Sequence, residues 1–237
     1  TIIDTVAPVF ADTAYLHTIA CDLFDTTTVY GVSATDECSL VVIAVTGNDE
    51  ISGTCPASYI RTYTATDACG NTATFEQAVN TIDTVAPAFD FVPEGYTALC
   101  HETHPLELAT ATDNCADEVD ISVAADTLIS DDCPQTYTVT RTFTAMDECD
   151  NLTSAVQVIE IVDTLAPTFI ESLPEDTVVL CHAVPAADVL TASDLCQEVD
   201  VAFQEDTLMS GDCPQSYTLT RTWSVADACG NSTSHIQ

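Results

Sequence analysis

A repeat of about 80 residues constrains the fold of this chain more than any other feature. The motif Asp-Thr-(Val/Leu)-Ala-Pro begins at Asp4, Asp83 and Asp163, at spacings of 79 and 80 residues. Each copy carries four cysteines and one arginine, and the arginines are Arg61, Arg141 and Arg221. The repeat predicts three homologous domains, at 4–82, 83–162 and 163–237.

The two ends of the sequence are in register with each other. Repeats one and two close with Asn80-Thr81-Ile82 and Glu160-Ile161-Val162, whereas repeat three stops at Gln237 and the chain begins with Thr1-Ile2-Ile3. Joining residue 237 to residue 1 gives a third period of 237 − 163 + 4 = 78 residues. We therefore expect an equivalent of residues 1–3 from a next segment to complete the third domain, with equivalent copies of the chain end to end as partners. An arbitrary sequence boundary is the alternative.

The charge excludes several classes of partner. There are 38 Asp and Glu against 3 Arg and no Lys, for a formal net charge of −35. Such a chain repels nucleic-acid phosphates and anionic lipid heads, so we expect no binding to nucleic acid or to a membrane surface. The longest purely apolar run, Leu40 to Val45, is far too short to cross a bilayer, so we expect no membrane insertion. Because 46% of the residues are hydrophobic, the chain can still bury real cores.

Strand patterns run through each repeat. Residues 137–145 alternate Thr on one face with Tyr, Val, Arg, Phe and Ala on the other, and 217–225 repeat this pattern with Trp223. Segments 119–124, 199–203 and 155–162 are also β-branched and alternating. About seven short strands per repeat predict an all-β chain of three tandem immunoglobulin-like β-sandwich domains, and the near absence of linkers predicts a rod.

These motifs resemble a known family. The succession of DT(V/L)AP-x-F, A-(T/S)-D-x-C, Y-x-(V/L)-T-R-T-(F/W) and D-(A/E)-C-(G/D)-N is similar to the HYR-like, four-cysteine immunoglobulin-type repeats of large secreted adhesins and surface proteins of Gram-negative gliding bacteria. The resemblance covers all three repeats and implies an extracellular or cell-surface location. Repeat one departs from it, with a shorter strand before Arg61 and Cys21-Asp22 where the others have Cys-His.

The twelve cysteines predict a disulfide framework, because their number is even and none forms a CxxC pair. The strand between the third and fourth cysteines of a repeat spans roughly 30 Å, against about 6 Å between the Cα atoms of a disulfide, which excludes that pairing. The second and fourth cysteines each follow an Asp in loops expected at one end of the sandwich. We therefore predict first-to-third and second-to-fourth pairs within each repeat: Cys21–Cys55, Cys38–Cys69, Cys100–Cys133, Cys115–Cys149, Cys181–Cys213 and Cys196–Cys229.

Carboxylates converge at the N-terminal end of each predicted domain. Oxygen ligands without His or Cys donors favour Ca²⁺, which takes about six to eight oxygens. The alternative is that Asp and Asn cap turns here, as they do in many loops. The predicted calcium ligands are Asp4, Asp36, Asp67 and Asn71; Asp83, Asp113, Asp147 and Asn151; and Asp163, Asp194, Asp227 and Asn231.

Asp-Thr pairs occur eight times. They resemble the O-glycosylation signal of the bacterial group named above, which implies covalent glycans on the chain. The candidate sites are Thr5, Thr84, Thr127, Thr164 and Thr207.

Catalytic signatures are absent from the sequence, since it holds neither a Ser-His-Asp nor an HExxH pattern, and we expect no enzyme. The repeated arginine is interpreted as a structural partner. The function predicted is a structural repeat unit of an extracellular filament, stalk or surface fibre, stapled by disulfides and O-glycosylated. The alternative is a calcium-dependent adhesin that binds glycans or another cell's surface.

Overall fold

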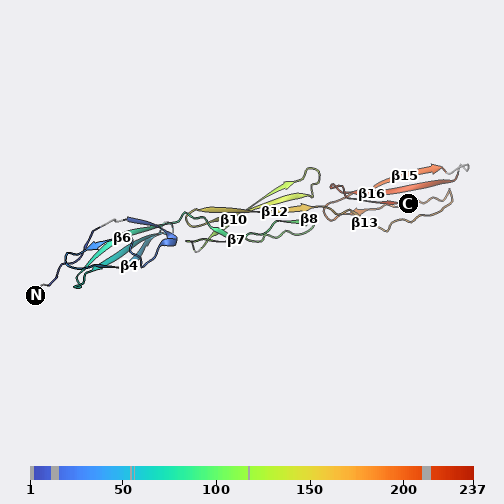
Figure 1. Cartoon of the computed structure of the whole chain (residues 1–237). Coiled ribbons are helices and arrows are strands. Elements are labelled where there is room, and N and C mark those ends of the chain that lie inside the picture. Colours follow the sequence, from blue (N-terminus) through green and yellow to red (C-terminus); the bar gives the residue numbers. More distant parts are fainter. Residues whose placement is uncertain (1–2, 12–15, 54, 56, 117, 210–214) are drawn as a thin grey trace. The chain divides into compact units, whose positions relative to one another are not determined.

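A computed structural model describes residues 3–11, 16–53, 55, 57–116, 118–209 and 215–237 (Figure 1). These residues form strands and one 3-10 turn, η1 (Cys21–Leu23), and no α-helix. The predicted all-β class is therefore confirmed for the part of the chain that the structure describes. The strands are β1 (Val9–Phe10), β2 (Leu16–Ala20), β3 (Ala34–Thr35), β4 (Val42–Ser52), β5 (Ser58–Thr66), β6 (Thr72–Ile82), β7 (Ala88–Phe91), β8 (Tyr96–Leu99), β9 (Thr110–Thr112), β10 (Asp120–Ile129), β11 (Tyr137–Met146), β12 (Leu152–Val162), β13 (Thr168–Phe169), β14 (Ala192–Ser193), β15 (Ala202–Met209), β16 (Tyr217–Ala226) and β17 (Ser232–Ile236).

The chain divides into two compact units whose boundaries differ from those of the sequence repeats. Unit 1 comprises Thr1–Val92, Ala109–Ser122 and Phe143–Ala155, and unit 2 comprises Pro93–Leu108, Val123–Thr142 and Val156–Gln237. Unit 1 thus contains the boundary between repeats one and two, and unit 2 contains the boundary between repeats two and three. The division into three domains remains a prediction.

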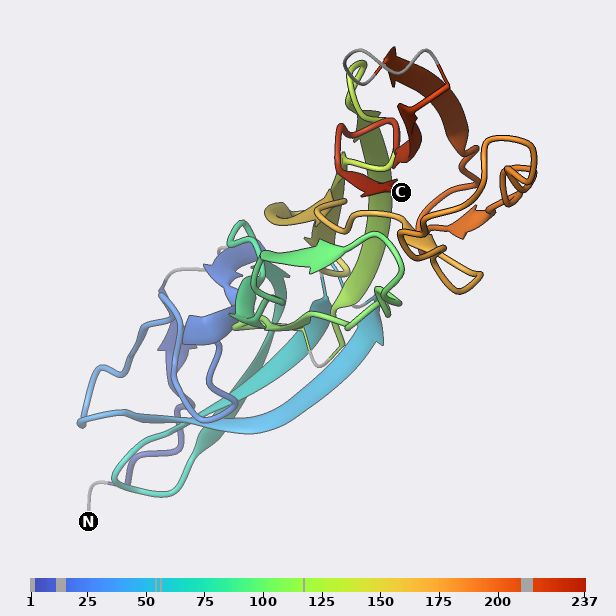
Figure 2. The ribbon, with the colours of Figure 1, turned by 90° about the vertical axis from the view of Figure 1, so that its right-hand side faces the viewer.

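Unit 1 contains a four-stranded sheet in the order β2-β6-β5-β4 and two small sheets, β1-β3 and β7-β9. The long strands β4 and β5 are antiparallel and lie side by side in Figure 2. Strand β2 pairs with β6 in parallel, with Leu16 opposite Ala78. Alternate residues of β5 are fully buried, namely Arg61, Tyr63 and Ala65, because successive side chains of a strand point to opposite faces.

Unit 2 holds the sheets β13-β14 and β15-β16-β17, together with the parallel pair of β8 and β12 from the sheet β10-β11-β12-β8. The core of this pair is Ala98, Ile159 and Ile161, against which Tyr137 and Val139 pack. In β16 the core-facing residues are Arg221, Trp223 and Val225.

The predicted strands at 137–145, 217–225 and 155–162 are confirmed as β11, β16 and the second part of β12, and 119–124 falls almost wholly within β10. The prediction at 199–203 is largely wrong, because β15 begins only at Ala202.

Candidate functional site

The loop D-(A/E)-C-(G/D)-N after the arginine strand folds around its own first residue. In repeat one, Asp67 Oδ1 accepts hydrogen bonds from the backbone N–H groups of Cys69 and Asn71, both at 2.8 Å. Repeat two has the same bonds to Asp147, at 2.8 and 2.9 Å. The fourth residue of the loop has positive φ, which glycine adopts without strain: Gly70 and Gly230 at 87°, and Asp150 at 64°. The sequence of this loop therefore dictates its local structure.

The asparagine that ends this loop ties it to the DT(V/L)AP motif. Asn151 Nδ2 donates to Asp147 Oδ2 at 2.8 Å and to the backbone oxygen of Asp83 at 3.4 Å. The other two repeats contain the same pair of bonds, from Asn71 and from Asn231. Each asparagine therefore holds two of the predicted acidic ligands at a fixed separation.

Three carboxylates meet where repeat two begins, within unit 1. One oxygen from each of Asp83, Asp113 and Asp147 lies within 4.8 Å of the other two. At the start of repeat one, Asp4 and Asp36 approach each other in the same way, together with the Cys38 sulfur. Asp163 and Asp194 do so in unit 2, together with the sulfur of Cys196. The sequence prediction that these side chains gather is therefore confirmed in part; Asp67 and Asp227 are not members of these tight groups.

In four of the clustered aspartates, one carboxylate oxygen accepts a local backbone hydrogen bond and the other has no partner; these are Asp4, Asp113, Asp163 and Asp194. Asp163 Oδ1 accepts from the backbone N–H of Leu165, and Asp194 Oδ1 accepts from that of Cys196. Asp163 Oδ2 and Asp194 Oδ2 are buried and have no hydrogen-bond partner. The same is true of Asp4 Oδ2 and Asp113 Oδ2. Turn capping explains the hydrogen bonds to the Oδ1 atoms, but it does not explain the burial of the Oδ2 atoms without a partner. A buried carboxylate oxygen without a partner is costly unless a cation or proton satisfies it.

Electrostatics separate the carboxylates into two kinds. Burial, together with the nearby charges of Asp113 and Asp147, raises the pKa of Asp83 above its ordinary value, and the pKa of Asp163 is raised by burial and by Asp194 and Asp227. The pKa of Asp147 is lowered, because hydrogen bonds from Asn151 and Cys149 outweigh its burial. A divalent cation bound beside Asp83 or Asp163 would favour the ionised form of that carboxyl group.

The donor set fits calcium. It offers hard carboxylate oxygens, and the cysteine sulfur beside Asp163 and Asp194 is already bonded to another cysteine, whereas the sulfur beside Asp4 and Asp36 belongs to the free Cys38. The side-chain nitrogens of Asn71, Asn151 and Asn231 donate to Asp67, Asp147 and Asp227. These asparagines could therefore bind a cation only through their side-chain oxygens, and their role as ligands stays a prediction.

The disulfides join successive repeats. Cys21 is bonded to Cys115 and Cys55 to Cys149, both within unit 1. Cys100 is bonded to Cys196 and Cys133 to Cys229, both within unit 2. The Cα–Cα distances, 4.5 to 5.8 Å, lie in the normal range for a disulfide. Each bridge closes a sequence separation of 94 or 96 residues, more than one repeat.

Five predicted pairings are therefore wrong. The first and third cysteines lie together at one end of a repeat, and the second and fourth lie together at the other end. The first and third cysteines of one repeat are bonded to the second and fourth cysteines of the next repeat, rather than to partners within the same repeat. Cys38, Cys69 and Cys181 are free and exposed, and Cys213 lies outside the described residues, so the pairing Cys181–Cys213 is not tested. The pairings that the structure contradicts are Cys21–Cys55, Cys38–Cys69, Cys100–Cys133, Cys115–Cys149 and Cys196–Cys229.

A cavity of about 230 Å³ lies beside the two bridges of unit 1. It is lined by all four bridged cysteines, with Phe24, Tyr59 and Asp83 among the other residues. The bridges and the acidic cluster therefore belong to the same repeat boundary.

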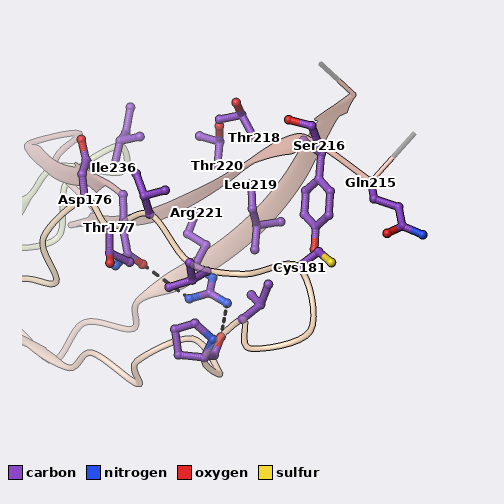
Figure 3. A pocket seen from close by; sticks show the side chains of 16 residues that line it. Asp176, Thr177, Cys181, Gln215, Ser216, Thr218, Leu219, Thr220, Arg221 and Ile236 are labelled. Atoms are coloured by element: carbon purple, nitrogen blue, oxygen red, sulfur yellow. Dashed lines mark hydrogen bonds between the residues drawn. The ribbon is translucent and has the colours of Figure 1, made fainter. Parts of the chain in front are cut away.

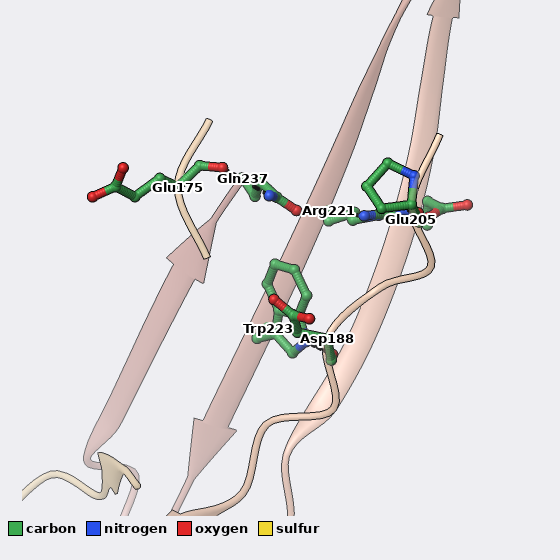
Figure 4. Close-up of polar contacts among 7 residues, drawn as sticks. Glu175, Asp188, Glu205, Arg221, Trp223 and Gln237 are labelled. Atoms are coloured by element: carbon green, nitrogen blue, oxygen red, sulfur yellow. Dashed lines mark hydrogen bonds and ion pairs between the residues drawn. The ribbon is translucent and has the colours of Figure 1, made fainter. Parts of the chain in front are cut away.

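The three arginines are structural. Arg61 is fully buried, donates to the backbone oxygens of Asp25 and Thr28, and lies over the rings of Phe24 and Tyr30. Arg221 donates to the Pro185 oxygen and forms an ion pair with Glu205 at 2.9 Å (Figure 4). In each repeat the guanidinium binds carbonyls about 36 residues earlier in the chain, which fastens an irregular segment onto the sheet.

Replacing Arg141 with Ala should lower the free energy of unfolding by about 3 kcal/mol, because the carbonyls of His104 and Pro105 would both lose their donor. Arg141→Lys keeps the charge and part of the hydrogen bonding, so its loss should be smaller. Urea denaturation of the two variants measures both values. Equal stability of Arg141→Ala and the parent chain would contradict the structural role.

A groove of about 670 Å³ opens in unit 2 beside Cys181 (Figure 3). The residues that line it include Val178, Val179, Tyr217, Leu219 and Arg221. Val178 is fully exposed, and Val179 is 43% exposed. Sequence reasoning did not foresee this groove.

The candidate glycosylation residues are all at the surface: Thr5, Thr84, Thr127, Thr164 and Thr207 are exposed. Their modification remains a prediction. Within the described ranges, the structure contains no helix with the length and apolar character needed to cross a bilayer.

No protein-family model and no curated protein sequence matches the chain. Among solved structures, the chain is similar to EC21–23 of human CDH23, with a TM-score of 0.38 and 13% identity over 98% of this chain and 99% of that one. It is also similar to EC1–4 of Drosophila N-cadherin, with a TM-score of 0.33 and 12% identity over 97% of this chain and 74% of that one.

Proposed function

We propose that the chain is a structural repeat unit of an extracellular filament, stalk or surface fibre, built from three immunoglobulin-like domains. The observation that carries this proposal is the disulfide pattern, in which two bridges join repeat one to repeat two and two more join repeat two to repeat three.

Bridges between repeats act differently from bridges within a repeat. A pulling force on the chain ends passes through every repeat boundary, where the backbone would otherwise be the single covalent connection. Cys21–Cys115 and Cys55–Cys149 add two covalent connections there. Such a boundary resists extension even when strand hydrogen bonds break, which is a property that a fibre needs and an isolated binding domain does not.

The same bridges support an extracellular or cell-surface location, because disulfides persist in oxidising compartments. The exposed Asp-Thr sites support covalent glycans on this surface. The proposal assigns no catalysis, since the repeated arginines are buried and occupied by backbone carbonyls.

Calcium is the cation that we assign to the acidic clusters. Asp83, Asp113 and Asp147 would hold it at the start of repeat two, and the unpartnered Oδ2 atoms of Asp4 and Asp163 support equivalent sites in the other repeats. Bound calcium would neutralise carboxylates that otherwise repel one another.

The second candidate function is a calcium-dependent adhesin, and the acidic clusters are the observation that favours it. A glycan site needs exposed aromatic rings for stacking. Among the described residues, the exposed aromatic side chains are Phe91, Tyr96 and Phe203, on three different strands. We therefore rank the structural role first.

Electron microscopy of the native assembly tests the proposal. We expect a continuous fibre with an axial period of one repeat or of three. Isolated particles without axial neighbours would contradict the filament role and leave the adhesin.

A further inference from the structure

A second kind of metal-binding group surrounds the Cys100–Cys196 bridge, within unit 2. The sulfur atoms of Cys100 and Cys196 and a ring nitrogen of His101 all lie within 4.8 Å of one another. One carboxylate oxygen from each of Asp163 and Asp194 also lies within 4.8 Å of the Cys196 sulfur. The bridge is therefore surrounded by a nitrogen donor and two oxygen donors.

The chemistry of this group depends on the state of the two cysteines. While the bridge is closed its sulfurs are not metal ligands, because a metal binds the thiolate. Once the bridge is reduced, the group offers two thiolates, an imidazole and a carboxylate. Zn²⁺ prefers this combination, whereas Ca²⁺ takes oxygen ligands alone. The reduced group thus differs in its metal preference from the clusters of aspartates.

The distances in the group suit a tetrahedral zinc ion. Zinc lies about 2.3 Å from sulfur and about 2.1 Å from nitrogen, so the ligand atoms of a tetrahedral site lie about 3.6 to 3.8 Å apart. The Cα atoms of Cys100 and Cys196 are 5.7 Å apart. Rotations of the side chains are therefore enough to bring the separated sulfurs and the imidazole around one ion.

Backbone hydrogen bonds hold both cysteines in place without the bridge. The N–H group of Cys100 donates to the backbone oxygen of Val162 at 3.1 Å. The N–H group of Cys196 donates to Asp194 Oδ1 at 2.8 Å. Because neither bond involves a sulfur atom, both can form in the reduced chain and keep the two thiols opposite each other.

Asp163 has the oxygen that a fourth ligand needs. Its side chain is only 6% exposed, and its Oδ2 atom is buried without a hydrogen-bond partner. Burial raises the pKa of Asp163, and His101 is close enough for its charge to act in the opposite direction. His101 itself is exposed, which gives a metal ion access to the group from solvent.

The boundary between repeats one and two lacks the nitrogen donor. The corresponding group there consists of Cys21, Cys115 and Asp83. The residue after Cys21 is Asp22, where Cys100 is followed by His101. The imidazole therefore distinguishes the second boundary from the first.

We propose that the reduced chain binds Zn²⁺ at the boundary between repeats two and three, through the thiolates of Cys100 and Cys196 and the imidazole of His101. Asp163 supplies the fourth ligand through its unpartnered oxygen. The zinc ion holds together the two cysteines that oxidation later joins. This site goes beyond the proposed function, and it leaves the calcium assignment unchanged because it exists only while the bridge is open.

Zinc binding and bridge formation are two balanced steps. When Zn²⁺ binds, the two thiols release two protons. On oxidation the two thiolates together lose two electrons and form the S–S bond, and Zn²⁺ is released. Oxidised glutathione accepts the two electrons by thiol–disulfide exchange, through a mixed disulfide, and leaves as two thiolates of reduced glutathione.

The test uses the whole 237-residue chain, reduced with a phosphine, with and without one equivalent of Zn²⁺. Iodoacetamide alkylates the thiols, and mass spectrometry measures the rate at each cysteine. Because a zinc-bound thiolate is shielded from the reagent, we expect Cys100 and Cys196 to react more slowly with zinc than without it. Cys133 and Cys229 should react at the same rate in both conditions, since they belong to no such donor group in the described part of the chain.

Replacement of the histidine provides the decisive comparison. His101→Asn should weaken zinc binding by about tenfold or more, because even the outer partners of metal ligands contribute 10- to 100-fold. Titration against a zinc-binding dye measures the affinity, and the slower alkylation of Cys100 and Cys196 should disappear in the same variant. His182→Asn is the matched control, because His182 also follows a cysteine and is exposed but lies outside this group.

Three results would overturn the proposal: equal alkylation rates with and without zinc, zinc protection spread evenly over all cysteines, or an unchanged zinc affinity in His101→Asn. Each of them leaves the proposed function intact as long as the oxidised chain maps with the four bridges between repeats. Loss of those bridges from the peptide map would instead remove the main support of the filament role.

Discussion

We expect the double replacement C55S/C149S to lower the free energy of unfolding by about 2 to 4 kcal/mol, and the melting temperature by on the order of 10 °C. The bridge closes a separation of 94 residues, so its loss frees a long segment of the unfolded chain. Because Cys21–Cys115 closes an overlapping loop, the effect should stay below that of an isolated bridge of this length. Calorimetry of the oxidised proteins measures the shift.

Single replacements distinguish the bridging partners. In C55S the thiol released should be that of Cys149, and mass spectrometry after alkylation should find the label there. A pairing within the repeat would instead release Cys21. C181S is the matched control, because Cys181 is exposed and free, and its effect on stability should stay within about 0.5 kcal/mol.

The strands were the part of the fold most readable from the sequence. In β11, Thr alternates with Val139, Arg141, Phe143 and Ala145, and the last three are buried in the structure. The parallel pairs of β2 with β6 and of β8 with β12 were not predicted. Segments 16–20 and 96–99 are short, and nothing in their residue pattern indicates which neighbour they pair with.

The cysteine pairing could not be predicted by considering one repeat alone, because the bridges join successive repeats. Loop positions correctly placed the first and third cysteines at one end and the second and fourth at the other. The sequence also showed that successive repeats join almost without a linker. That observation was the available signal, because a direct join brings the end with Cys21 and Cys55 against the start of the next repeat. Treating each repeat as a closed domain led to the wrong pairs.

The acidic clusters were predictable in membership but not in detail. The sequence predicted that Asp83, Asp113 and Asp147 lie together, and the structure places them within one group. The sequence could not show that Asn151 directs its nitrogen to Asp147, or that Asp113 uses Oδ1 for two backbone bonds and leaves Oδ2 without a partner. These features depend on side-chain rotamers, which the residue pattern does not determine.

Calcium should stabilise unit 1 through Asp113, and Asp113→Asn should remove that stabilisation. At a calcium concentration 10 to 100 times the dissociation constant, one site contributes about 1.4 to 2.7 kcal/mol. Asn keeps the acceptor for the backbone N–H groups of Cys115 and Ala116, so the turn should survive the change. Thermal unfolding with calcium and with chelator measures the difference. Asp120→Asn is the matched control, because Asp120 is exposed at the start of β10 in the same unit.

The raised and lowered pKa values also predict the direction in which folding stability changes with pH. A raised pKa for Asp83 means that the folded chain binds a proton more tightly than the unfolded chain, so in chelator stability should fall as pH rises from the ordinary Asp value through the raised one. Asp147 has a lowered pKa, so its ionised carboxylate stabilises the folded chain. This stabilisation is lost at more acidic pH, as pH falls below the ordinary pKa of Asp. Calcium should cancel the first trend, because it binds the ionised carboxylate. Asp113→Asn should weaken that trend in chelator, because it removes one of the charges that raise the pKa of Asp83.

The effect of Asp113→Asn should therefore have opposite directions in the two conditions. In chelator at neutral pH the variant loses a repelling charge and should be as stable as the parent chain or more stable. In calcium it loses a ligand and should be less stable. If the carboxylates only cap turns, the difference between variant and parent should be the same with calcium and with chelator, and an unchanged difference would exclude the calcium site at this cluster.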